Sequence, residues 1–157
     1  MTRRSHYSRE FIDRLRTTSL FCGCSASEVR LAASLLTELW FSAGRVLIRQ
    51  DEVGNECFVL VSGEAVVERD GMIVGHATAG AIVGELALMG GVSRTATVTA
   101  TTDIQLLVMS RREFASLRAL RIRSIEERLA ATASEHCAAL ARLPTRALST
   151  SAAISTA

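Results

Sequence analysis

The chain has 157 residues, of which 48% are hydrophobic and 22% are charged. This length is enough to bury one good core and too short for two large domains, so we expect a single domain. The formal net charge is only +2, from 18 basic residues, all of them arginine, and 16 acidic ones spread along the chain. That balance lacks the polybasic footprint of a nucleic-acid binder. No apolar run is long enough to cross a bilayer, so we expect a soluble cytoplasmic protein that does not bind membranes.

The first part of the chain is expected to be helical after a short N-terminal arm at residues 1–9. Three apolar residues share one helical face: Phe11, Ile12 and Leu15. The sequence SASE at residues 25–28 is a capping box, which opens a second helix running through Leu36. The N-terminal helices therefore occupy about residues 10–37.

From about residue 39 to residue 109 the hydrophobic residues follow a period of two, which is typical of strands. Ser-Gly at 62–63 and Asp-Gly at 70–71 are turn signals, and the second is a strong hairpin dipeptide. The clearest strand is TATVTAT at 95–101. Short strands separated by turns favour an antiparallel roll or barrel over a parallel sheet.

A helical period returns at SRRE, residues 110–113, which is a second capping box. A longer apolar stripe follows: Ile122, Ile125, Leu129 and Ala133, continuing through Cys137 toward Leu140. We expect two C-terminal helices over about residues 111–142, packed on the roll or covering it. The stripe is too short for a long coiled coil, but homodimerisation through this helix stays open. Pro144 ends the helix, and residues 143–157 are expected to form a disordered tail.

The predicted fold class is therefore α+β, mainly β, in one domain over residues 10–142. It is an antiparallel double-stranded β-helix, or jelly-roll-like β-roll, flanked by N-terminal helices and two C-terminal helices.

Neither the cysteines nor the histidines have the spacing of metal ligands. The cysteines form no C-x-x-C pair, and we interpret all of them as small buried hydrophobic residues in a reducing compartment: Cys22, Cys24, Cys57 and Cys137. A cupin-type enzyme would need several metal ligands on its strands, where only His76 lies. We therefore expect no metal, no cofactor, no catalytic residue and no enzymatic activity.

The stretch VGELALMGGVSRTATV, residues 83–98, contains one acid and one base among small apolar residues. Gly84 lets the backbone approach a ligand closely, and ELALM after it can form a helical turn whose free N–H groups favour a phosphate. Arg94 supplies a full charge and a planar fork that matches phosphate oxygens. Ionised Glu85 only accepts hydrogen bonds, which suits sugar hydroxyls. The alternative is a buried ion pair between Glu85 and Arg94, which would leave the glycine and the helical turn unexplained.

These residues resemble the cyclic nucleotide-binding domain family. Its phosphate-binding cassette reads approximately F-G-E-[LI]-A-L, a short variable stretch, and R-[ATS]-A-[TS]-V. Residues 84–88 match its first part, Arg94 falls at the right distance, and residues 96–98 close it. Upstream positions also match the family's first strands: Gly44, Gln50, Gly54, Phe58 and Gly63. The resemblance covers roughly residues 10–142 and is closest to bacterial cAMP-receptor-like regulatory domains.

The resemblance implies a role for each matching residue. It places Arg94 on the cyclic phosphate and Glu85 on the ribose 2′-hydroxyl. It also implies that the C-terminal helix covers the base as a lid, over about residues 121–142. Backbone N–H groups complete the pocket near Gly84, Leu86, Ala87 and Ala96. Three positions depart from the family pattern. Val83 and Ser93 loosen the cassette without removing a contact. Asp51 stands where a turn glycine is common, in a conformation that Asp tolerates better than most residues.

The expected function is a stand-alone cyclic nucleotide sensor, whose ligand-induced repositioning of the C-terminal helix is read by an unidentified effector protein. The likeness to bacterial members favours cAMP. The Thr95 hydroxyl keeps cGMP open, because it can reach the 2-amino group of a syn guanine. DNA binding is not expected, because residues 143–157 cannot supply a helix-turn-helix. The alternative is a nucleotide-silent, degenerate domain used for dimerisation or scaffolding, against which the intact Glu85 and Arg94 argue.

Overall fold

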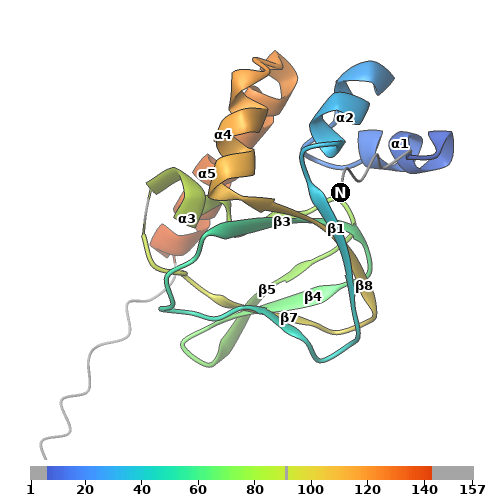
Figure 1. Cartoon of the computed structure of the whole chain (residues 1–157). Coiled ribbons are helices and arrows are strands. Elements are labelled where there is room, and N and C mark those ends of the chain that lie inside the picture. The colour runs from blue at the N-terminus through green and yellow to red at the C-terminus, as the bar shows by residue number, and fades with distance from the viewer. Residues whose placement is uncertain (1–6, 91, 143–157) are drawn as a thin grey trace, which may run out of the picture.

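The computed structural model describes residues 7–90 and 92–142, in which eight strands form two antiparallel sheets (Figure 1). The first sheet has the order β1-β8-β3-β6: Thr37–Phe41, Ile104–Ser110, Glu56–Ser62 and Ile82–Val83. The second has the order β2-β7-β4-β5: Val46–Ile48, Thr97–Ala100, Ala65–Arg69 and Met72–Ala77. The predicted mainly β roll is confirmed. The predicted tail over 143–157 and most of the arm over 1–9 lie outside the described residues.

The first sheet separates two hydrophobic cores, because β3 is buried on both faces. Side chains alternate between the two faces of a strand. Phe58 and Leu60 face the interior of the roll, between the two sheets. Val59 and Val61 face the other way and join the core beneath the helices. This double burial explains why β3 and β8 are apolar at almost every position, rather than alternating apolar and polar.

The longer helices cover the outer face of the first sheet (Figure 1): α1 (Arg9–Arg16), α2 (Ala26–Ala33), α4 (Arg111–Ala119) and α5 (Arg123–Arg142). Both predicted capping boxes are confirmed. Ser25 and Ser110 accept hydrogen bonds from backbone amides three residues ahead, and Glu28 and Glu113 accept from the serine amides in return. These local bonds fix where α2 and α4 begin.

Two turns have the conformations that their sequences predict. Asp70 and Gly71, between β4 and β5, have φ of +52° and +77°, as a two-residue hairpin requires. Asp51 has φ of +68°, the left-handed conformation that glycine adopts more readily. The side chain of Gln50 ties the two turns together, because its Nε2 donates to Asp70 Oδ1 at 2.8 Å and its Oε1 accepts from the Asp70 amide at 2.9 Å.

Two sequence expectations about local structure are corrected. Helix α2 ends at Ala33 rather than Leu36, because the amides of Leu35 and Leu36 bond carbonyls only three residues back and tighten the chain toward β1. The cysteines are all free, but only Cys24 and Cys57 are buried. The other two are exposed: Cys22 in the α1–α2 connection, and Cys137 in the part of α5 after Leu129, where no described residue is fully buried.

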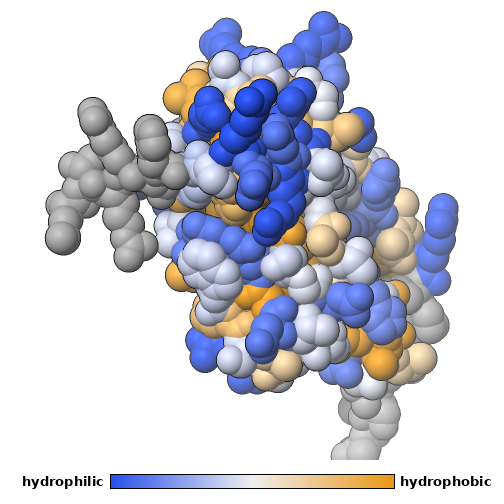
Figure 2. All heavy atoms as spheres, turned by 90° about the vertical axis from the view of Figure 1, so that its right-hand side faces the viewer, coloured by the Kyte–Doolittle hydropathy of each residue, from blue (hydrophilic) through white to orange (hydrophobic). Residues whose placement is uncertain are grey.

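One side of the molecule shows few extended apolar areas among the described residues (Figure 2). Seen from the right-hand side of Figure 1, hydrophobic residues form small areas separated by hydrophilic ones (Figure 2). No helix in the described part of the chain combines the length and apolar composition needed to cross a membrane. Within the same residues, no three metal-ligating side chains come together as a potential ion site.

Candidate functional site

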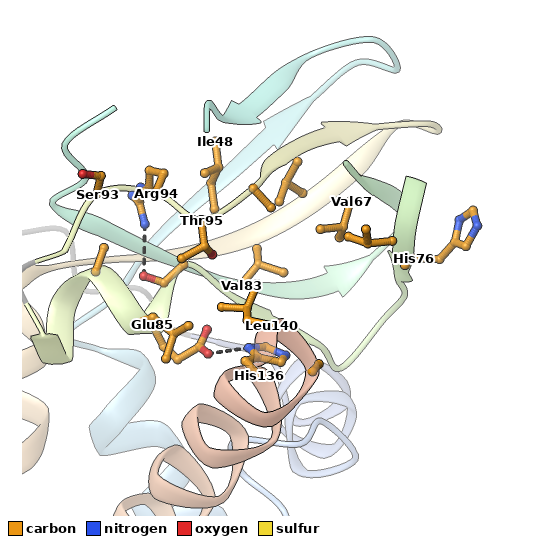
Figure 3. A pocket seen from close by; sticks show the side chains of 18 residues that line it. Ile48, Val67, His76, Val83, Glu85, Ser93, Arg94, Thr95, His136 and Leu140 are labelled. Carbon is orange, nitrogen blue, oxygen red and sulfur yellow. Dashed lines mark hydrogen bonds and ion pairs between the residues drawn. The ribbon is translucent and has the colours of Figure 1, made fainter. Parts of the chain in front are cut away.

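A cavity of about 280 Å³ lies between the second sheet, the segment around α3 (Glu85–Gly90) and the last turns of α5 (Figure 3). All the residues proposed from the sequence line it: Gly84, Glu85, Leu86, Ala87, Arg94, Thr95 and Ala96. Apolar side chains from the sheet, among them Ile48, Val67 and Val98, form the opposite wall. The fold therefore brings the whole predicted set together.

Gly84 is required by both conformation and space. Its φ is +87°, and a Cβ at this position would lie 2.6 Å from Nη1 of Arg94 and 3.1 Å from the carbonyl oxygen of Glu56. Helix α3 begins at the next residue, as the sequence predicts for ELALM. The glycine therefore lets a helical turn start against the guanidinium without a clash.

Arg94 is fixed at both its backbone and its side chain. Its amide donates to the carbonyl of Glu52, and its carbonyl accepts from the amide of Asp51, each at 2.8 Å. The left-handed turn at Asp51 is thus hydrogen-bonded directly to the backbone of Arg94. The guanidinium donates through Nη1 to the Gly84 carbonyl at 3.0 Å (Figure 3). Through Nη2 it donates to the Glu56 carbonyl. The residue is only 8% exposed.

No carboxylate oxygen of the described residues lies within 4.0 Å of the Arg94 guanidinium. The alternative of a Glu85–Arg94 ion pair is therefore wrong. Burial lowers the pKa of Arg94 from its usual value, and the nearby acidic groups of Cys57, Glu56 and Glu85 partly oppose this shift wherever they are ionised. Burial also raises the pKa of Cys57, with the Glu85 charge adding to the effect, so its thiol stays neutral. The site holds a buried cation whose direct contacts are carbonyl dipoles, which favours an anion nearby.

The Glu85 carboxylate is almost completely buried, with 1% of the residue exposed. Its Oε1 is hydrogen-bonded to Nδ1 of His136, from α5 (Figure 3). Its Oε2 is buried and has no hydrogen-bond partner among the described residues. A buried acceptor without a donor is costly, so this oxygen marks a place for one.

His136 was not predicted as a site residue. The sequence placed the apolar stripe of α5 through Cys137, but Cys137 is exposed and His136 faces the cavity. The hydrogen bond to Glu85 raises the pKa of His136, against the opposing effect of desolvation. One signal was available: His136 lies seven residues after Leu129, which is two turns along the same helical face.

The comparisons with known proteins agree with this geometry. The family model described as "Cyclic nucleotide-binding domain" matches residues 38–120, more than half of the chain. The chain belongs to the cyclic nucleotide-binding domain family. The match includes the whole cassette, from Gly84 to Val98.

Relatives of the chain include a cGMP-dependent protein kinase and a regulatory subunit of a cAMP-dependent protein kinase. The cGMP-dependent protein kinase egl-4 of Caenorhabditis elegans is 42% identical over 77 residues, which cover 49% of this chain and 10% of the kinase. The cAMP-dependent protein kinase regulatory subunit of Mycosarcoma maydis is 34% identical over 125 residues, which cover 75% of this chain and 23% of the subunit. The chain thus spans less than a quarter of each relative.

Solved structures of the family share the fold. The structure of Sp-2Cl-cAMPS bound to PKAR CBD2 matches with a TM-score of 0.75 at 26% identity, covering 87% of this chain and 92% of that one. The Catabolite Activator Protein of Thermus thermophilus matches with a TM-score of 0.70 at 25% identity, covering 77% and 59%. Both likenesses extend the family assignment to the β-roll together with its flanking helices.

Proposed function

We propose that the chain binds a cyclic nucleotide in this cavity, with cAMP favoured over cGMP. One observation supports the proposal above the rest. The buried guanidinium of Arg94, which has no carboxylate contact among the described residues, shares the cavity with the unpartnered Oε2 of Glu85. A cyclic nucleotide carries one diester charge and one ribose 2′-hydroxyl, which supply the anion and the donor that these two groups lack.

In this proposal each side of the ligand has its own contacts. Arg94 uses two of its five N–H groups on carbonyls, and the remaining ones are available to the phosphate. Backbone amides near Leu86, Ala87 and Ala96 add further donors. Glu85 accepts from the 2′-hydroxyl, and Thr95 lies on the wall near the base. We propose no catalytic role for any of these residues.

The proposed signal is a movement of helix α5. Cyclic nucleotide changes the position of α5, and a partner protein, not yet identified, recognises the change. A ligand shifts such an equilibrium only by its different affinities for the two positions of the helix. The names of two relatives refer to protein kinases that depend on cGMP or cAMP. For this chain, the partner and the direction of regulation stay open to experiment.

One observation favours the second candidate function, a nucleotide-silent module for dimerisation or scaffolding. The Glu85 carboxylate is 1% exposed and one of its oxygens already contacts His136, so the chain itself partly satisfies the group that the proposal assigns to the ribose. The same binding experiment separates the two functions.

The test is calorimetric titration of the purified, nucleotide-free protein with cAMP and then with cGMP. Arg94→Leu is expected to weaken binding by roughly 2–5 kcal/mol, because the phosphate charge is left unpaired in the pocket. Arg30→Leu is the matched control, since Arg30 is an exposed arginine on α2, away from the cavity. Arg94→Lys keeps the positive charge but lacks the planar guanidinium, so its nucleotide affinity is expected to lie between those of the wild type and Arg94→Leu.

Folding of each variant is checked by circular dichroism and thermal unfolding before titration. A folded wild-type protein that binds neither nucleotide at millimolar concentration would reject the proposal and favour the silent module. A change of less than threefold for Arg94→Leu would reject the role given to Arg94. Tighter binding of cGMP than of cAMP would reverse the proposed preference.

A further inference from the structure

The buried carboxylate of Glu85 takes its counter-charge from helix α5. Only 1% of Glu85 is exposed, and an ionised carboxylate away from water is costly unless a cation or several donors lie beside it. Within the described parts of the chain, His136 is the only basic side chain within 4.0 Å of this carboxylate. Arg94 lines the same cavity but forms no ion pair with it. The charge of Glu85 is therefore balanced by His136 rather than by Arg94.

The pairing holds one oxygen of the carboxylate and leaves the other for a ligand. Oε1 of Glu85 is hydrogen-bonded to Nδ1 of His136, so the imidazole fixes the orientation of the carboxylate (Figure 3). Oε2 has no partner among the described residues, and it is the oxygen for which the proposed function supplies the ribose 2′-hydroxyl. A donor from the ligand thus meets a carboxylate that α5 already holds in place.

The protonation state of His136 also sets the net charge around the ligand. Arg94 is positive and ionised Glu85 is negative, so these two side chains together leave the cavity without net charge. A cyclic nucleotide brings a further negative charge with its phosphodiester. Protonated His136 makes the set of three positive, which matches that ligand. Such a difference acts more strongly in a partly dehydrated cavity than in water.

We propose that protonated His136 is a positioning residue of the nucleotide site: it holds and neutralises Glu85, so that this carboxylate accepts from ribose while the phosphate lies beside Arg94. This inference rests on the proposed function for the identity of the ligand. It adds to the site a side chain from α5, outside the residues 38–120 that the family model matches. It also makes nucleotide binding depend on a proton.

The surroundings of His136 allow it to gain and lose that proton near neutral pH. The hydrogen bond to Glu85 raises the pKa of His136, desolvation opposes the shift, and the charges of Glu85 and Glu135 add to the rise. The His136 side chain is 43% exposed, so its proton exchanges directly with solvent. A histidine with a moderately raised pKa titrates in the physiological range.

The other titratable side chains around the pair do not share this behaviour. The Arg94 guanidinium stays protonated. Burial raises the pKa of the Cys57 thiol, with the Glu85 charge adding to the effect, so the thiol stays neutral. His76 on β5 lines the same cavity, but its ring is directed away from the other lining residues (Figure 3). His76 therefore serves as a matched control for His136.

The direction of the pH effect follows from the charges. An anionic ligand nearby favours protonated His136, so the pKa of His136 is higher with nucleotide bound than without it. Binding therefore takes up a proton between these two pKa values, and the affinity rises as the pH falls through that range. Both values lie above the ordinary value of about 6.5, so the affinity should level off below it. The phosphodiester and ordinary carboxylates keep their charge there, so the slope belongs to the histidine.

The test is calorimetric titration with cAMP at about pH 6 and about pH 9, on variants first checked for folding by circular dichroism. His136→Ala removes both the hydrogen bond and the charge. It is expected to bind cAMP roughly tenfold more weakly than wild type at the lower pH, with little dependence on pH. His136→Gln keeps a neutral donor, so its affinity should lie between those two at the lower pH and should also lack the slope. His76→Ala is expected to keep the wild-type slope.

Proton uptake gives a direct reading of the same linkage. Titrations in buffers of different ionisation enthalpy should show a proton taken up on cAMP binding by wild type and His76→Ala, and none by His136→Ala. Equal or tighter cAMP binding by His136→Ala at about pH 6 would overturn the inference. A wild-type affinity that does not rise as the pH falls would overturn it as well.

A second measurement examines the pairing without nucleotide. The ring titration of His136 is followed by nuclear magnetic resonance in wild type and in Glu85→Gln. We expect a raised pKa of His136 in wild type that falls toward about 6.5 in Glu85→Gln and rises further when wild type is saturated with cAMP. Identical titration of His136 in both proteins would reject the inference. A wild type that binds neither nucleotide would reject the proposed function together with this inference, whereas unchanged cAMP binding by His136→Ala rejects the inference alone.

Discussion

Arg94 shows how much of the candidate site depends on residues that do not themselves line the cavity, such as Gly54 and Glu56. Its guanidinium passes so close to Gly54 that a Cβ there would lie 1.8 Å from Nε. Sequence patterns identified Arg94 and Glu85 as the charged pair of the site. They did not reveal the carbonyl partners of Arg94, because Glu56 is 38 positions away and contributes only its backbone.

We predict that Gly54→Ala impairs the site strongly, although the substitution adds only one methyl group. The added methyl group would displace the guanidinium, so nucleotide affinity should fall at least about tenfold with a loss of stability of roughly 1–3 kcal/mol. Gly90→Ala is the control, because its Cβ would meet nothing closer than Val92 Cγ1 at 3.8 Å. Calorimetry and urea unfolding measure the two effects, and equal affinities in both variants would contradict the prediction.

The elements differ in how well local sequence determines them. The capping boxes of α2 and α4 involve partners three residues apart, so their positions were predictable. Beyond Leu129 the apolar stripe of α5 was predicted only in part. Leu140, toward which the stripe continued, lines the cavity, but Cys137 is exposed and His136 faces the cavity instead. The partner of His136 on α3, Glu85, lies 51 positions away in sequence.

Helix α5 should respond differently to the same substitution in its two halves. Leu129 is 2% exposed and belongs to the core beneath the helices, so Leu129→Ala should lower the free energy of unfolding by about 2–4 kcal/mol. Leu140 is only partly buried at the cavity mouth, so Leu140→Ala should cost less than about 1 kcal/mol. Urea unfolding curves compare the two variants. Equal losses would mean that α5 is held along its whole length.

For the whole molecule, the family resemblance predicted the β-roll and the period of two predicted its strands. The partners of each strand were not predictable from periodicity. For example, β8 pairs with both β1 and β3, far apart in sequence. The two cores on either side of the first sheet follow from that pairing, since it buries both faces of β3 and β8.

Stability of the whole molecule should depend on pH through His136. Its pKa is raised in the folded protein, so the contribution is complete below the unfolded value of about 6.5 and is lost as the pH rises through the folded value. The His136 side chain is 43% exposed, so after solvent screening the contribution should stay below about 1 kcal/mol. Urea unfolding across this range should give a falling curve for wild type. The His136→Ala curve should lack this component, and parallel curves would argue against it.

The exposed Cys137 sits on the same helix as His136, in the next position of the chain. Two other cysteines are buried in the interior, and the remaining exposed thiol, Cys22, lies far away in sequence, in the α1–α2 connection. Once Cys22 is replaced by serine, a single fluorophore can be attached through Cys137 to α5, the helix whose repositioning we propose, at a cysteine that the chain already carries. The native chain is thus one substitution away from an optical reporter of its own conformational state.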